Sequence, residues 1–222
     1  MEYFRLLNST KIFCDANEFE CQAMMFCFKT RFKTFDKSEK ILSQGDPLEN
    51  VVLILKGGAN VENIDALGDI SILMRVRSGE CYGLEQAFNR DLTYKDNLVA
   101  TEKTFVMFMN AHRLINPCEN KCKRHEFVTK NLMKLVAENN LKLLDKLSHM
   151  SKKTTREKLL SYFHSMQSKS SNPYFEIPFN KTELASYLSV DRSAMSAELS
   201  KLKKEGIIDF DKNQYRIKIN KE

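Results

Sequence analysis

The sequence lacks long apolar runs: nothing in it approaches the roughly eighteen consecutive apolar residues that a membrane-spanning helix needs. A cleavable signal segment is not recognisable either, so we expect a cytoplasmic protein that lies neither in nor across a membrane. Cysteine is sparse, with six residues among 222. Because no secretory segment accompanies them, we expect reduced thiols and no disulfide framework.

Histidine is scarcer still, and its four residues, at positions 112, 125, 149 and 164, fall mostly on predicted helices. Neither a nucleophile with a base nor a carboxylate cluster surrounds them, so we do not expect an enzyme.

Charged residues are frequent and unevenly distributed along the chain. Residues 1–120 carry 14 basic and 17 acidic side chains, net −3, and the remainder carry 21 and 12, net +9, which sum to the overall +6. A basic C-terminal half is typical of proteins that bind nucleic-acid phosphates, although a lysine-rich helical surface has the same composition.

The most informative stretch is residues 180–202, whose pattern predicts two short helices joined by a tight turn. The second helix has an apolar stripe at i, i+4 and i+7, made of Met195, Leu199 and Leu202. Asp191 is a good N-cap for this helix, and Gly206 stands where a helix of about fourteen residues would end. This pattern indicates a helix-turn-helix, which places a helix in the DNA major groove; a helical hairpin without DNA binding is the alternative.

Two short strands around a polar turn follow at residues 207–210 and 215–219. A third strand is expected at residues 174–179, where Pro178 implies the edge of the sheet. Together they predict the wing of a winged helix, and the helix before the turn is expected from Thr182 to Leu188. The candidate DNA contacts are Arg192, Ser193, Ser196, Ser200, Lys181, Thr182, Lys203 and Lys212.

Between Phe32 and Met109 the pattern changes to short apolar or alternating runs that are separated by turns. The expected strands are residues 40–42, 51–55, 59–62, 70–74, 98–100 and 105–109. All the glycines except Gly206 lie in this part, several of them at turn positions. The pattern predicts a double-stranded β-helix or jelly roll, and hence an α+β protein when the C-terminal helices are included.

A long helix is predicted from about Cys118 to Met150. It carries a stripe with 3-4-3-4 spacing: Met133, Val136, Asn140, Leu143, Leu147 and Met150. Such a stripe is typical of a coiled-coil seam, and a single asparagine in it favours a dimer of fixed register. In the alternative interpretation Asn140 is exposed and the stripe packs on its own β-roll. A second stripe could serve that packing instead: Leu132, Leu135 and Leu144.

A capping box at residues 154–157 opens another helix that is expected to continue to about Gln167, before a flexible connector at residues 168–173.

The order of β-roll, long helix and winged helix, together with residues 154–160 and 177–196, resembles the Crp/Fnr family of bacterial transcription regulators, in its Firmicutes branch. The resemblance covers nearly the whole chain. It implies three parts: an effector-sensing domain at 1–117, a dimerisation helix at 118–150 and a DNA-binding domain at 151–222.

The resemblance also implies a function. A homodimer would read one half of a roughly palindromic DNA operator with each recognition helix, and would contact RNA polymerase if it activates transcription. Arg192, Ser193 and Ser196 would face the bases. The family often has a second basic residue where this chain has Ala197, so the operator sequence does not follow from the resemblance.

The effector site departs from the family pattern for cyclic nucleotides, in which an arginine neutralises the phosphate and a glutamate binds the ribose. Here Tyr94 stands in place of the arginine, Leu84 replaces the glutamate, and Asp96 adds a negative charge. Lys95 cannot supply the bidentate fork of an arginine. We therefore expect an unidentified effector that is not cyclic AMP, and the candidate pocket is Tyr82, Gly83, Leu84, Glu85, Tyr94 and Lys95.

Because of its cysteines, a metal- or redox-responsive regulator is an alternative function for this protein. Cys118, Cys122 and His125 share one helical face and could hold a metal, although packing or helix capping explains them as well. The N-terminal cysteines stand where oxygen-sensing relatives hold an iron-sulfur cluster, but their spacing of six and five residues is not that of a cluster: Cys14, Cys21 and Cys27. A ligand-independent DNA-binding protein is a further alternative.

Overall fold

The computed structural model describes residues 4–14, 16–65, 67–89, 91–116, 123–211 and 213–218, and the side chains of residues 123–125 lie outside this description. The chain divides into two compact units, Met1–Asn140 and Leu141–Glu222. The long helix α5, Lys123–Met150, contributes residues to both units. Within the described ranges no helix is both long enough and apolar enough to cross a membrane.

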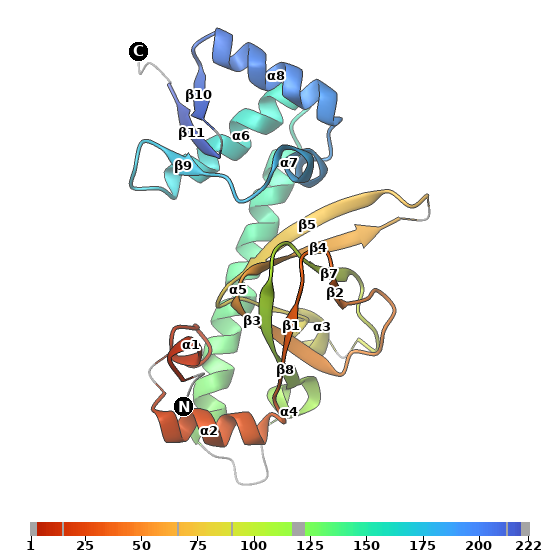
Figure 1. Cartoon of the computed structure of the whole chain (residues 1–222), viewed down its shortest axis with the longest axis vertical. Coiled ribbons are helices and arrows are strands. Elements are labelled where there is room, and N and C mark those ends of the chain that lie inside the picture. Colours follow the sequence, from red (N-terminus) through yellow and green to blue (C-terminus); the bar gives the residue numbers. More distant parts are fainter. Residues whose placement is uncertain are drawn as a thin grey trace. The chain divides into compact units, whose positions relative to one another are not determined.

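The first unit contains two four-stranded antiparallel sheets, with strand orders β1-β8-β3-β6 and β2-β7-β4-β5 (Figure 1). The strands are β1 Arg31–Phe35, β2 Lys40–Leu42, β3 Asn50–Lys56, β4 Gly58–Ile64, β5 Ile70–Arg77, β6 Cys81–Tyr82, β7 Asn97–Ala100 and β8 Thr104–Asn110. The β-roll prediction is confirmed, and all six expected strands are present. Sequence reasoning missed β1, of which only Phe35 is buried, and β6, which has two residues.

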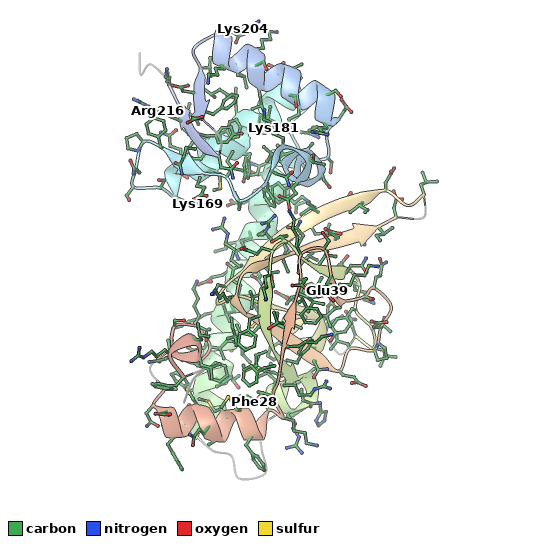
Figure 2. The ribbon with its side chains drawn as sticks, in the orientation of Figure 1. Phe28, Glu39, Lys169, Lys181, Lys204 and Arg216 are labelled. Carbon is green, nitrogen blue, oxygen red and sulfur yellow. The ribbon has the colours of Figure 1, made fainter. Side chains whose placement is uncertain are left out.

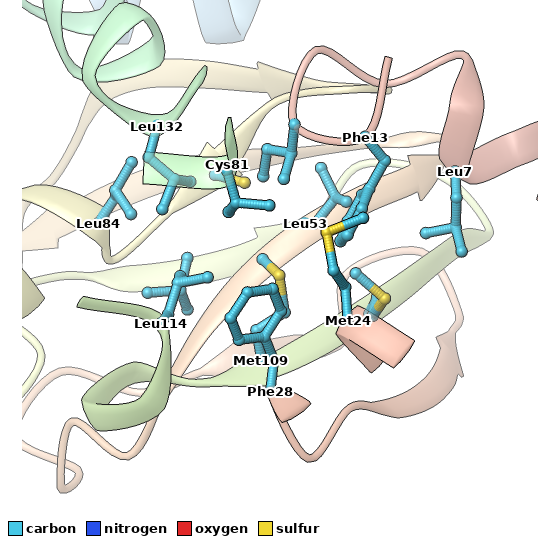
Figure 3. Packing of buried hydrophobic residues seen from close by; sticks show 14 of the residues in the cluster. Leu7, Phe13, Met24, Phe28, Leu53, Cys81, Leu84, Met109, Leu114 and Leu132 are labelled. Carbon is cyan, nitrogen blue, oxygen red and sulfur yellow. The ribbon is translucent and has the colours of Figure 1, made fainter. Parts of the chain in front are cut away.

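Strand β3 is buried on both faces, which explains why its sequence is continuously apolar and does not alternate. Val52 and Ile54 pack into a core between the two sheets. The intervening residues Val51, Leu53 and Leu55 face a second core that also includes side chains from the helices. Figure 3 shows this second core, where Phe13, Leu53 and Leu132 are among the labelled side chains. A strand that is buried on both faces has no polar face to display.

The helices of the first unit are α1 Phe4–Asn8, α2 Glu18–Cys27, α3 Leu84–Phe88, α4 Ala111–Ile115 and the larger part of α5. A capping box between Asn17 and Glu20 sets the start of helix α2. In α5 the residues Leu132 and Leu135 are buried in the helix-lined core, as one of the two proposed stripes requires. The prediction was wrong for Leu144, which is 53% exposed.

The stripe of α5 with 3-4-3-4 spacing is mostly exposed. Met133 is 66% exposed and Leu147 is 62% exposed, while Val136 is half-buried and Asn140 is exposed. Val136 packs against the core of the first unit, whereas Met133, Leu143 and Leu147 are exposed, so only part of this stripe packs on the protein's own fold.

The second unit is built from α6 Thr155–Ser168, α7 Lys181–Leu188 and α8 Arg192–Lys204, with a sheet in the order β10-β11-β9. Its strands are β9 Phe175–Glu176, β10 Ile208–Asp211 and β11 Gln214–Ile217. The third wing strand is an edge strand as expected, but it is only two residues long and ends before Pro178. Aromatic rings fill the centre of this unit, where Tyr215 lies 5.2 Å from both Phe163 and Phe210 between ring centroids.

Candidate nucleic-acid interface and effector pocket

Helix α8 has the boundaries that its sequence predicts. The Asp191 carboxylate accepts a hydrogen bond of 2.7 Å from the Ala194 amide and so caps the helix. Gly206, at φ 74°, follows its C-terminus in the left-handed conformation that suits glycine. The stripe expected to pack is buried: Met195, Leu199 and Leu202. The cap and the stripe together fix which face of α8 remains available for binding.

The available face of α8 is short and polar. Arg192 and Ser193 are exposed in its first turn, and Ser200 is exposed two turns later. Ser196 is only half-buried, because it lies beside the packed stripe. The Ser200 hydroxyl donates to the Ser196 carbonyl at 3.0 Å, so its remaining capacity is that of an acceptor. Small side chains and one arginine let this face approach a flat partner closely.

The helix before the turn begins at a capping box. The Asn180 side chain accepts hydrogen bonds from the amides of Thr182 and Glu183, at 2.9 and 3.0 Å. Lys181 and Thr182 are exposed in this first turn, where the positive end of the helix dipole favours an anion. The Lys181 ammonium also lies 5.7 Å from the Phe210 ring centroid, so this basic side chain of α7 lies next to the wing.

Two basic residues of α6 hold the helix-turn-helix together, and sequence reasoning missed both. Lys158 Nζ donates to the carbonyls of Leu188 and Ser189, each at 3.3 Å, which satisfies the C-terminus of α7 at the turn. The Arg156 guanidinium bonds Glu198 at 3.1 Å and also bonds Glu205, both on or next to α8. These hydrogen bonds raise the pKa of Arg156. They position α8 from behind its exposed face.

Lys203 contacts the wing and is also partly exposed to solvent. Its Nζ donates to the Phe210 carbonyl at 2.7 Å and lies 3.6 Å from the Asp209 carboxylate. Asp209 accepts a hydrogen bond from Lys218, and this bond lowers the pKa of Asp209. The Lys203 side chain is still half-exposed, so it can hold the wing and face an anion at once. Lys212 lies outside the described residues.

Basic side chains surround this face on several elements. Figure 2 labels Lys181, Lys204 and Arg216, on α7, α8 and the wing respectively. Arg216 lies 5.6 Å from the ring centroid of the half-exposed Tyr174. The second unit therefore offers one short polar helix face flanked by cations, which is the arrangement that binding to duplex DNA needs.

Several residues of the predicted effector pocket are buried or hydrogen-bonded within the protein. Gly83 has φ 87° and precedes α3, and Leu84 is fully buried. Tyr94 is 3% exposed, and its hydroxyl donates to the Asn50 carbonyl at 2.6 Å and accepts from the Asn50 amide at 3.3 Å. Burial raises the pKa of Tyr94. A neutral, fully engaged phenol at this position cannot neutralise a phosphate.

Asp96, Tyr82 and Gln86 take part in a hydrogen-bonded network. The Asp96 carboxylate accepts from Asn63 at 2.9 Å and from the Tyr82 hydroxyl at 3.4 Å, and Gln86 donates to the same hydroxyl at 3.0 Å. Burial raises the pKa of Tyr82 well above its ordinary value, so Tyr82 stays neutral. The two donors on Asp96 leave a buried negative charge satisfied from within the fold.

The other two candidates of the pocket face elsewhere. Glu85, on α3, accepts a hydrogen bond of 2.7 Å from Asn139, which is buried on α5. The Lys95 side chain is largely exposed and lies 3.9 Å from Asp91. The pocket residues are therefore close in the fold, but their polar groups already have partners within the protein.

The cysteine candidates are only partly within the described ranges. Cys118 and Cys122, and the side chain of His125, lie outside them. Cys21 is buried in α2, and burial raises the pKa of its thiol. Cys14 donates to the Lys11 carbonyl at 3.3 Å. Across the described residues, no three histidine, cysteine or acidic side chains gather closely enough to hold a metal.

Comparisons with known proteins agree with this arrangement. A family model for the cyclic nucleotide-binding domain matches residues 32–121, and one for the Crp-like helix-turn-helix domain matches residues 157–222. A search of curated proteins found no match.

Solved structures share the fold at low identity. The c-di-GMP responsive global regulator CLP of Xanthomonas campestris superposes with a TM-score of 0.72 at 14% identity, over 90% of this chain and 99% of that one. A mutant of CooA from Carboxydothermus hydrogenoformans gives 0.71 at 17%, over 95% and 96%. FixK2 from Bradyrhizobium japonicum gives 0.68 at 19%, over 86% and 93%.

Proposed function

Because the chain belongs to the Crp/Fnr family of transcription regulators, we propose that it binds a roughly palindromic operator as a homodimer, with α8 of each copy in the major groove. The observation that carries this proposal is the exposed first turn of α8, where Arg192 and Ser193 stand next to the Asp191 cap. Family members are regulators, so we assign no catalytic role. We place the protein in the cytoplasm, with its operator DNA.

The proposed base contacts are on α8. Arg192 supplies the bidentate donor that suits guanine, and the hydroxyls of Ser193, Ser196 and Ser200 supply short contacts to base edges or the backbone. The proposed phosphate contacts are Lys181, Thr182, Lys203 and Lys212. Positions on the first turn of α7 and beside the wing suit this role, because they flank the helix that enters the groove.

The proposed dimer interface is the stripe of α5 with 3-4-3-4 spacing: Met133, Val136, Asn140, Leu143 and Leu147. Apolar side chains that stay this exposed on one helix are favourable to bury against a second copy. The exposed Asn140 would meet the Asn140 of that copy and fix the register. In this proposal residues 1–117 sense an effector, 118–150 form the dimer and 151–222 bind DNA, with RNA polymerase as a further partner if the protein activates.

The proposed effector is not cyclic AMP, because Tyr94 is bonded to the Asn50 backbone where a phosphate-neutralising arginine would be needed. A second candidate is regulation without a small-molecule ligand. The internal hydrogen bonds of Tyr94, Asp96 and Glu85 favour it, since these three side chains already have partners within the protein. A change in operator affinity on addition of metabolite extract would favour the liganded form instead.

Selection of duplexes from a randomised pool tests the proposed function. We expect the full-length protein to enrich a two-fold symmetric sequence. Arg192→Ala should weaken binding to that sequence and relax the preference at one base pair of each half-site. Arg31→Ala is the matched control, because it removes one exposed arginine from β1 and should leave the affinity unchanged. Enrichment of no sequence would reject the proposal.

A further inference from the structure

The exposed face of α8 has an alanine at its centre. Ala197 is exposed and stands two residues after the buried Met195 and two before the buried Leu199. Because an α-helix turns by about 100° per residue, Ala197 lies on the side of the helix opposite to both. Ser193, four residues earlier, and Ser200, three residues later, share this side and are exposed as well. The middle of the face therefore carries one methyl group between two hydroxyls.

The orientation of this face is held from behind. Arg156 of α6 bonds Glu198, the residue next to Ala197, at 3.1 Å, and the Glu198 side chain is only 20% exposed. Glu198 is the one acidic residue within Arg192–Lys204, so this bond directs the only carboxylate of α8 toward α6. A carboxylate on the binding face would repel phosphates and accept hydrogen bonds from cytosine. With Glu198 bonded to α6, Ala197 is left to meet the bases.

Short neighbours let the Ala197 methyl group come near the floor of a major groove. The basic side chains of α8 lie in its first and last turns, and Figure 2 labels Lys204 near the end of the helix. Cations at both ends can reach the phosphates that border the groove. The centre of the face carries no charged side chain that would have to lose its water on close approach.

The chemistry of the major groove decides which base suits a methyl group. Thymine presents a 5-methyl group there, whereas the edges of guanine and cytosine present hydrogen-bonding atoms. An alanine that packs on the thymine methyl group removes apolar surface of both partners from water. The same alanine against a G·C pair would cover polar atoms without bonding them, which costs free energy. A T·A pair is therefore favoured opposite Ala197.

We propose that Ala197 is a specificity-determining residue, whose methyl group packs against the 5-methyl group of a thymine in each half-site of the operator. Ala197 lies about 7.5 Å along the helix axis from Arg192. Base pairs are spaced by about 3.4 Å, so the thymine belongs about two base pairs from the pair that Arg192 contacts. This inference rests on the proposed binding of α8 in the major groove.

The test compares thymine with deoxyuridine, which lacks only the 5-methyl group. Each thymine of the duplex that the full-length protein selects is replaced in turn, in both half-sites, and the affinity is measured by fluorescence anisotropy. We expect the wild type to lose about fourfold per half-site at one position, and about fifteenfold for the symmetric pair. Deoxyuridine also alters the shape of a duplex, so the same comparison is made with variants.

Three variants separate the methyl contact from other effects. Ala197→Gly should bind the thymine and deoxyuridine duplexes equally, because it has no methyl group that could lose a contact. Ala194→Gly makes the same exchange at another exposed position of α8 and should keep the wild-type preference for thymine. Each variant is compared with itself on two duplexes, so the cost of glycine within a helix cancels. Ala197→Arg should change the preferred pair at this position to G·C, because arginine donates two hydrogen bonds to guanine.

A selected half-site in which no replaced thymine weakens wild-type binding overturns the inference. A loss that Ala197→Gly retains in full also overturns it, because the effect would then belong to DNA shape or to another residue. If Ala197→Gly does not fold, Ala197→Arg decides: a change to G·C at the deoxyuridine-sensitive pair supports the inference, and an unchanged preference overturns it. If no duplex is selected, the proposed function fails together with the inference, whereas a selected duplex without a thymine effect rejects the inference alone.

Discussion

Replacing Leu147 by alanine should weaken the proposed dimer strongly. Fully burying a leucine stabilises by about 1.5 to 3 kcal/mol, and Leu147 is 62% exposed, so a partner would add about 1 to 2 kcal/mol per copy. A two-fold symmetric interface loses this contribution twice, about 2 to 4 kcal/mol. The dimer dissociation constant should then rise about 30- to 900-fold. Sedimentation equilibrium over a range of protein concentrations measures it directly.

Leu92→Ala is the control for this experiment. Leu92 is also a strongly exposed leucine, but it lies in the loop between α3 and β7 and is not part of the proposed stripe. Leu92→Ala should leave the dimer dissociation constant within about twofold of the wild-type value. A threefold or smaller effect of Leu147→Ala, or an equal effect of Leu92→Ala, would refute the reasoning that this stripe of α5 is the interface.

Four further results are expected. Asp191→Ala should lower the free energy of unfolding of the second unit by about 1 kcal/mol in denaturant titration, because α8 loses its cap, whereas Asp191→Asn should cost much less. Lys181→Met should reduce the slope of log affinity against log salt by about one if Lys181 neutralises a phosphate; an unchanged slope would remove it from the interface. The melting temperature should rise between pH 8 and 10, because burial lowers the folded-state pKa of Lys146, on α5, below its unfolded value, and this rise should be missing in Lys146→Met. Calorimetry should detect no cyclic AMP binding at micromolar concentrations, since Tyr94 replaces the arginine; a micromolar dissociation constant would contradict this.

The winged helix could be predicted in detail because its signals are local. A side-chain cap lies within three residues of the amide it bonds, so Asp191 and Thr154 each mark a helix start from the sequence alone. The spacing of Met195, Leu199 and Leu202 likewise states which face of α8 is buried, without knowledge of what covers it.

Contacts between distant residues could not be predicted. Arg156 and Glu198 are 42 residues apart, and Glu85 and Asn139 are 54 apart, and nothing in either local pattern points to the other partner. The five-residue helices α1, α3 and α4 are too short for a periodic signal. The effector pocket shows the same limit: the sequence shows that the arginine is replaced, but only the fold shows that Tyr94 is bonded to Asn50.

Strand β3 separates neighbouring residues into two different environments. Val52 and Ile54 pack into the core between the two sheets. Val51, Leu53 and Leu55 pack into the core that is shared with the helices. Among relatives, substitutions at alternate positions of this strand should therefore covary with two separate groups of partners. A slip of one residue would exchange the groups, so the strand cannot slide. The two cores therefore hold β3 in one register against both of its faces.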